Sequence, residues 1–102
     1  MIKIIVTRKN DKITSLEVSG HANYEVKGKD IVCAGVSAIV VGGFNALAKC
    51  NPNLDIVVTD KVSKVKITDV NDNNIQSILN TMYIQLDTIY QSYPKNISIK
   101  EV

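Results

Sequence analysis

Apolar and polar residues alternate along five short stretches of the chain and recur at helical spacing along two longer ones. The alternating stretches are rich in Val, Ile and Thr, which favour β-strands. They predict strands over residues 2–7, 13–19, 54–59, 62–69 and 96–101. Asn10-Asp11 and Asp60-Lys61 separate consecutive stretches, which predicts two hairpins.

The first helix is expected to begin after Asp30, a good N-cap residue, and to run to about Cys50. Asn51-Pro52-Asn53 then ends it. Small residues recur every four positions and form a stripe on one face, where another element can approach closely, either within the chain or across a dimer. The stripe consists of Ala34, Ala38, Gly42 and Ala46.

The second helix is expected over residues 72–92, with Asp72 or Asn71 as its cap and Pro94 beyond its end. The resulting order ββαββαβ indicates an α+β fold, in which two helices pack on one mixed or antiparallel sheet. A chain of 102 residues is large enough to bury one core, so we expect a single domain over residues 1–102.

Residues 31–48 carry no charge, which is the lower end of a membrane-spanning length. Ser37, Asn45 and three glycines interrupt this stretch, and short polar loops flank it. These features favour a helix that is buried on most of its sides within the domain, and no membrane partner is expected.

The overall charge is nearly balanced, at +2 from 12 basic and 10 acidic residues. Direct binding of nucleic acid, which needs a concentrated basic face, is therefore not expected. The first residues already follow a strand pattern, so no signal peptide is expected, and the two cysteines suggest reduced thiols in the cytoplasm. The helical rise places Cys33 and Cys50 about 25 Å apart, too far for a disulfide.

His21 is the sole histidine, and it follows Gly20, whose missing side chain lets the chain turn sharply. Cys33 is expected as the third residue of the first helix, where unpaired N–H groups and the positive end of the helix dipole favour an anion. A thiolate is the nucleophilic form of cysteine, and imidazole transfers protons near neutral pH. The pair therefore fits nucleophilic catalysis with a general base.

Residue type and spacing alone leave a structural explanation open for each of these positions. A cysteine in an apolar helix is commonly a small buried side chain, Asp30 is explained as a cap, and Ser37 as a tolerated small residue. Cys50 has no partner nearby in the sequence and is interpreted as structural. One histidine and two distant cysteines do not assemble a structural zinc site, so neither a metal nor another cofactor is expected.

Three segments together resemble the signature of the ribosomal-processing cysteine proteases: Gly20-His21-Ala22, Gly28-Lys29-Asp30-Ile31-Val32-Cys33-Ala34 and Val36-Ser37-Ala38. The chain length and the order ββαββαβ are similar to that family as well. The resemblance implies that Cys33 is the nucleophile and His21 the base, with Asp30 and Ser37 at further motif positions.

The resemblance also implies a homodimeric bacterial peptidase of the cytoplasm. Members of the family remove a short N-terminal extension from protein twenty-seven of the large ribosomal subunit, cutting after an aromatic residue. The implied partner is thus a ribosomal protein precursor, bound as a peptide substrate. Asn23 and Gly35 stand where relatives often carry Gly and Ala. Two other functions stay open: a non-catalytic binding module for ribosome assembly, and a thiol redox sensor.

Residues 20–29 show neither the alternation of a strand nor the spacing of a helix. They therefore predict a loop, which connects His21 to the helix that carries Cys33. Residues 22–29 are expected to be mobile in the free protein and to close over a bound peptide, with Gly28 as a hinge. Tyr24 and Val26 are the expected apolar contacts to substrate, although Tyr24 also fits a packing anchor.

Two expectations concern the start of the first helix. Its backbone N–H groups, including that of Cys33, are expected to stabilise an oxyanion. Asp30 is able either to orient His21 or to cap the helix, and we favour the cap.

Overall fold

The computed structural model describes residues 1–26 and 28–102 and confirms the order ββαββαβ. The elements are β1 (Ile2–Lys9), β2 (Lys12–Ser19), α1 (Ile31–Cys50), β3 (Asp55–Val58), β4 (Val62–Lys66), α2 (Asn73–Ser92) and β5 (Ile97–Glu101). At the first hairpin, Asn10 and Asp11 have φ angles of 52° and 65°. Asn and Asp tolerate this left-handed conformation, which two-residue hairpin turns require.

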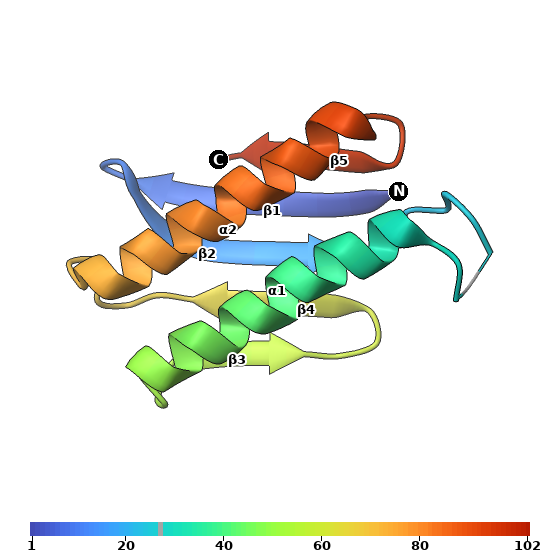
Figure 1. Ribbon diagram of the computed structural model, residues 1–102. Helices are drawn as coiled ribbons and strands as arrows, with labels where there is room; N and C mark the ends of the chain where they lie inside the picture. Colours follow the sequence, from blue (N-terminus) through green and yellow to red (C-terminus); the bar gives the residue numbers. More distant parts are fainter. Residues whose placement is uncertain (27) are drawn as a thin grey trace.

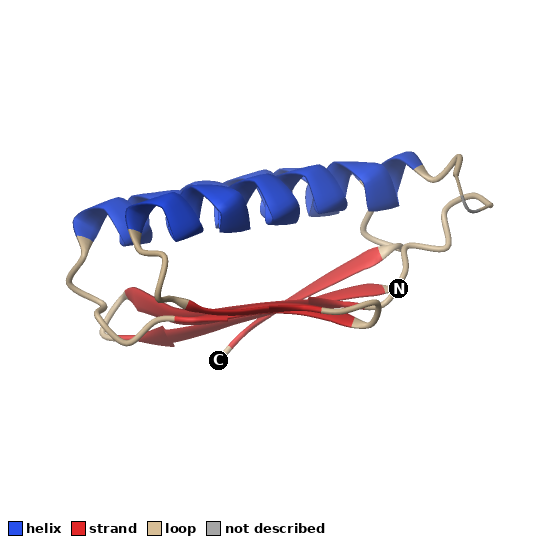
Figure 2. Cartoon of the chain, turned by 90° about the horizontal axis from the view of Figure 1, so that it is seen from below, coloured by secondary structure: helices blue, strands red, loops and turns tan. Residues whose placement is uncertain are grey.

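The strands form one mixed sheet in the order β3-β4-β2-β1-β5. β1 and β5 pair in parallel, whereas the other neighbouring strands are antiparallel. Both helices lie on the same face of the sheet (Figures 1 and 2), so the molecule has two layers. The expected α+β fold is therefore confirmed, with a mixed rather than a purely antiparallel sheet.

The core fills the space between the sheet and the two helices. Alternate positions of the central strands are buried, including Ile4, Val6 and Leu16, because successive side chains of a strand point to opposite faces. Each fully buried aliphatic side chain contributes roughly 1.5–3 kcal/mol to stability. The helices contribute two buried stripes: Val32, Val36, Val40, Phe44 and Leu47 from α1, and Ile75, Gln76, Leu79, Met82 and Leu86 from α2.

The predicted stripe of small residues on α1 is displaced by one position from the face that meets α2. Ala34, Ala38 and Gly42 are exposed, and a Cβ built on Gly42 would meet nothing within 4 Å. A Cβ on Gly43 would instead collide with the side chain of Met82 on α2. The expectation of a close helix contact within the chain was thus wrong for the predicted stripe, because the large side chains of α1 decide which face turns inward.

The expectation that α1 is buried on most of its sides was also wrong. The helix is long and apolar enough to cross a membrane by length and composition, with a mean hydropathy of 2.0, yet only 28% of that window is buried. One stripe of α1 packs on the sheet, and residues such as Ile31 and Val41 are exposed. α1 is therefore one member of an outer helical layer, as Figure 2 shows.

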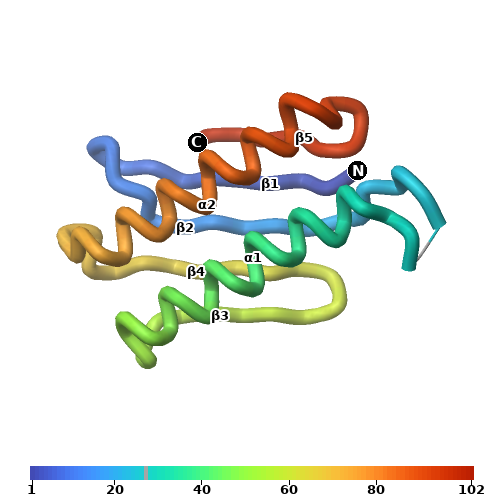
Figure 3. Tube along the Cα trace, in the orientation of Figure 1, coloured from blue at the N-terminus to red at the C-terminus, as the bar shows by residue number. Residues whose placement is uncertain are grey.

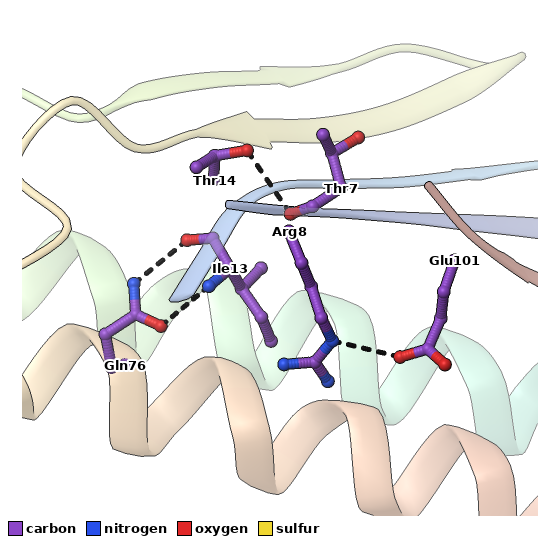
Figure 4. Close-up of polar contacts among 6 residues, drawn as sticks. All are labelled: Thr7, Arg8, Ile13, Thr14, Gln76 and Glu101. Carbon is purple, nitrogen blue, oxygen red and sulfur yellow. Dashed lines mark hydrogen bonds and ion pairs between the residues drawn. The ribbon is translucent and has the colours of Figure 1, made fainter. Parts of the chain in front are cut away.

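A polar cluster fixes α2 and β5 to the first hairpin (Figure 4). The side-chain amide of buried Gln76 accepts a hydrogen bond from the Ile13 N–H and donates one to the Ile13 carbonyl, both at 2.9 Å. Arg8 donates to Glu101 at 2.9 Å and lies over the ring of Tyr83. Burial, followed by the charge of Glu101, raises the pKa of Tyr83. The cluster closes the end of the sheet where the β1–β2 turn lies.

Candidate active site

The residues singled out in the sequence gather at the other end of the molecule. The loop that follows β2, the first turn of α1 and the tip of the β3–β4 hairpin all lie at this end (Figure 3). The turn between α2 and β5 reaches the same place, because Asn96 contacts the loop. The continuous segment formed by the loop and the start of α1 thus meets two turns that are distant from it in sequence.

Asp30 caps α1, as the sequence predicted. Its Oδ1 accepts a hydrogen bond from the Cys33 N–H at 2.9 Å, and its Oδ2 accepts bonds from the N–H groups of Tyr24 at 3.0 Å and Glu25 at 3.5 Å. The bond from Cys33 is the main reason why the pKa of Asp30 is lowered. Both carboxylate oxygens therefore hold backbone groups, which joins the loop to the start of α1.

This cap corrects the expectation that the Cys33 N–H stabilises an oxyanion. That N–H already donates to Asp30, so it is not a free donor. Another backbone donor at the site is the N–H of Ala22, which donates to Cys33 Sγ at 3.3 Å. It points at the sulfur, the atom that in cysteine peptidases bonds to the carbonyl carbon of the substrate.

Cys33 is the third residue of α1 and is partly exposed, with a free thiol. Cys50 lies at the other end of α1, is exposed and also has a free thiol. The prediction that these two cysteines do not pair is therefore confirmed. Cys33 also packs against the core and at the same time lines two cavities.

Ala22 is the point at which the loop is fastened to the rest of the molecule. It is buried, with 2% of its surface exposed. Its carbonyl accepts a hydrogen bond at 2.9 Å from the side-chain amide of Asn96, in the turn before β5. Sequence reasoning missed this contact, because an asparagine after Pro94-Lys95 is equally typical of any polar turn.

Two cavities meet at the predicted dyad. The larger, of about 590 Å³, is lined by the loop and the start of α1, including Asn23, Glu25 and Gly28. The smaller, of about 230 Å³, lies between α1 and the tip of the β3–β4 hairpin. His21, Cys33 and Ser37 line both cavities, so the structure brings these three residues together.

Three loop residues have backbone conformations that match their type. Gly20 has φ 83°, and a Cβ there would collide with the carbonyl of Met1, so the sharp turn before His21 requires glycine. Gly28 has φ 90° in open space. Asn23 has φ 55°, a left-handed conformation that asparagine adopts more readily than most residues.

Tyr24 and Val26 do not line either cavity next to the dyad. Tyr24 packs edge-on against Tyr93, with the ring centroids 5.3 Å apart, and 62% of Val26 is exposed. Their contact with substrate stays a prediction, as does closure of residues 22–29, of which residue 27 lies outside the described residues.

The described residues contain no group of three or more His, Cys, Asp and Glu side chains placed to hold a metal ion. What the site offers is a thiol at a helix start, an imidazole on the same cavities and a backbone N–H donor at the sulfur. This combination of residues is that of cysteine peptidases.

Comparison with known proteins agrees with this class. The family model described as cysteine protease Prp matches residues 1–98, and the chain belongs to this family. The ribosomal processing cysteine protease Prp of Bacillus subtilis strain 168 is 36% identical over 107 residues, covering 97% of this chain and 96% of the relative.

Two solved structures of an essential ribosomal processing protease Prp from S. aureus share the fold. One, in complex with a covalently linked product peptide, superposes with a TM-score of 0.94 at 34% identity, covering 100% of both chains. The other, in complex with a substrate peptide, gives a TM-score of 0.87 at 33% identity, again over 100% of both chains.

Proposed function

We propose that this protein is a cytoplasmic, homodimeric cysteine endopeptidase, with residues 1–102 as its single domain. Its substrate is the precursor of protein twenty-seven of the large ribosomal subunit, from which it removes a short N-terminal extension. The observation that carries the proposal is the meeting of His21 and Cys33 at the junction of two cavities. Membership of a family whose relatives are named for ribosomal processing supports the substrate.

The proposed reaction begins with transfer of the Cys33 thiol proton to His21. The thiolate attacks the scissile carbonyl carbon, and the carbonyl π electrons move to the oxygen. When the intermediate collapses, the peptide C–N bond breaks and His21 gives its proton to the leaving amine. Water, deprotonated by His21, then attacks the thioester, which releases the new C-terminal carboxylate and restores the thiol.

The oxyanion needs a donor close to the sulfur, and the Ala22 N–H supplies it in this mechanism. It already donates to Sγ at 3.3 Å, and an oxygen on the carbon bonded to Sγ comes within reach of the same group. Because Ala22 is buried, the donor is held in place before substrate arrives. Ser37, one helical turn beyond Cys33, lines both cavities and is assigned a supporting role in substrate contact.

Incubation with the ribosomal precursor of the same organism, followed by intact-mass measurement, tests the proposal. We expect two new masses that sum to the precursor plus one water, and a transient acyl adduct on the enzyme. Binding without cleavage would favour a recognition module. Oxidation of Cys33 without cleavage would favour a thiol sensor.

A further inference from the structure

The smaller cavity at the dyad continues away from it as a groove along α1. A neighbouring cavity of about 360 Å³ lies between α1 and β3 and is lined by Phe44, Leu54 and Ile56 among others. Val41 lines both cavities and so forms their junction. The groove therefore starts at Cys33 and His21 and ends near Pro52, with α1 as one wall and the β3–β4 hairpin as the other.

The far part of this groove is mainly apolar, whereas the part next to the dyad also has polar lining residues, such as Thr59, Asp60 and Lys61. Val36, Val40 and Val41 line its first part, and the second part is formed mostly by aliphatic and aromatic side chains. Val41 and Val58 leave 51% and 59% of their surfaces exposed, although both lie in the groove. An apolar ligand side chain that covers them gains the free energy of removing that surface from water.

The length of the groove suits an extended peptide. Its lining on α1 runs from Cys33 to Ala48, which is about 22 Å at the helical rise of 1.5 Å per residue. An extended chain advances about 3.3 Å per residue, so roughly six or seven residues span this distance. A peptide whose scissile bond lies at Cys33 therefore reaches the far end of the groove.

We propose that the substrate lies extended along this groove on one side of its scissile bond, and that Val41 and Val58 select apolar side chains several residues from the cleavage point. This inference rests on the proposed peptidase function and deepens it. The groove includes Cys33 and His21 themselves, so a second copy of the chain seated in it would cover the nucleophile. A peptide substrate satisfies the same apolar lining and places its carbonyl at the sulfur.

Substitutions of exposed apolar residues inside and outside the groove test whether the groove itself binds the peptide. Val41→Asn and Val58→Asn place an amide in the groove without adding charge near His21. Val57→Asn is the control on the same strand, because Val57 is paired with Lys64 and lines neither cavity of the groove. Ile84→Asn is the control on a helix, because 62% of Ile84 is exposed on α2 and it also lies outside the groove.

Each variant is assayed on precursor peptides with eight residues on either side of the cleavage point and on peptides shortened from each end. We expect KM for the long peptide to rise about tenfold in Val41→Asn and Val58→Asn and to stay within twofold in both controls. Shortening one end of the peptide should raise KM for the wild type and have little further effect in the groove variants, because the contact is already lost.

Two results would overturn the inference. One is that the groove variants and the control variants have the same KM, while the wild-type enzyme cleaves normally. The other is a change of sedimentation from dimer to monomer in the groove variants alone, which would make the groove a subunit interface. Failure of the wild type to cleave any of the peptides would instead count against the proposed function itself.

Discussion

The side chain of Asn96 and the backbone of Ala22 are joined by a hydrogen bond of 2.9 Å, although 74 positions separate them in sequence. The N–H of Ala22 in turn donates to Cys33 Sγ. In the proposed mechanism, Asn96 is therefore a positioning residue that acts on the sulfur through Ala22. Its hydrogen bond holds the backbone of Ala22, the residue that follows His21 and donates to the sulfur.

Asn96→Ala is expected to lower kcat about tenfold, because a misplaced donor loses transition-state contact steeply with distance. KM should change little. Asn80→Ala is the control, because the Asn80 side chain donates to a backbone carbonyl at the same 2.9 Å within α2. An equal loss of kcat in both variants would show that Asn96 contributes only to stability.

The dyad makes the strongest prediction for activity. Cys33→Ala and His21→Ala should each lower the cleavage rate at least about a thousandfold, since residues that act as a unit fail together. Cys50→Ser should cleave normally, because Cys50 is exposed at the far end of α1. Cleavage is followed by intact mass, and circular dichroism verifies folding. Substantial turnover by Cys33→Ala would refute the assignment of the nucleophile.

The lowered pKa of Asp30 predicts that the free energy of unfolding decreases at acid pH. Its pKa in the folded protein is lowered from the usual 3.8 by the N–H of Cys33. A lowered pKa means that the folded state favours the ionised form, so the stabilisation is complete above the usual value and is lost as the pH falls through the lowered one. Urea unfolding of the wild type and of Asp30→Asn should therefore differ at pH 6 and converge at the acid end. A difference independent of pH would contradict this cause.

Neighbouring glycines of α1 should respond oppositely to the same substitution. Gly42→Ala adds a methyl group in open space and should stabilise the protein by about 0.5–1 kcal/mol. Gly43→Ala drives its methyl into Met82 and should destabilise it by about 1–3 kcal/mol. Urea denaturation measures both. Stabilisation by both changes would mean that the flexible Met82 side chain moves aside at little cost.

A substitution at Gly28 tests the effect of backbone conformation in the loop without a steric clash. A Cβ there meets nothing within 4 Å, but φ 90° is strained for an L residue. Gly28→Ala should therefore lower turnover several-fold with little change in the thermal unfolding midpoint. Hydrogen exchange of the loop, with and without a peptide bound to Cys33→Ala, tests whether this segment closes. Slow exchange in the free protein that a peptide leaves unchanged would mean a preformed site.

The features that the sequence predicted correctly are those that depend on residues close together in the chain. Asp30 and Asp72 cap the two helices because each has a side-chain oxygen within reach of N–H groups two or three residues later. The hairpin at Asn10-Asp11 likewise depends on its own two residues. These features depend on neighbours in the chain, so the pattern of residues was sufficient for them.

What the sequence did not predict depends on distant partners. The spacing of Ala34 and Gly42 identified a face of small residues, but the face that meets α2 is set by Met82 and by the large side chains of α1. The contact of Asn96 with Ala22 and the apolar groove likewise form only when β3, β5 and α1 are brought together. No residue near Cys33 in the sequence carries information about them.

The parallel pairing of β1 with β5 has a consequence for biosynthesis. On a translating ribosome, β1 emerges first and its neighbour β5 is made after every other element of the fold. Asn96, one residue before β5, arrives equally late. The nascent chain thus already carries His21 and Cys33 while the residue that fastens the loop between them is still missing. The fold therefore cannot complete this part of the site until β5 has been made.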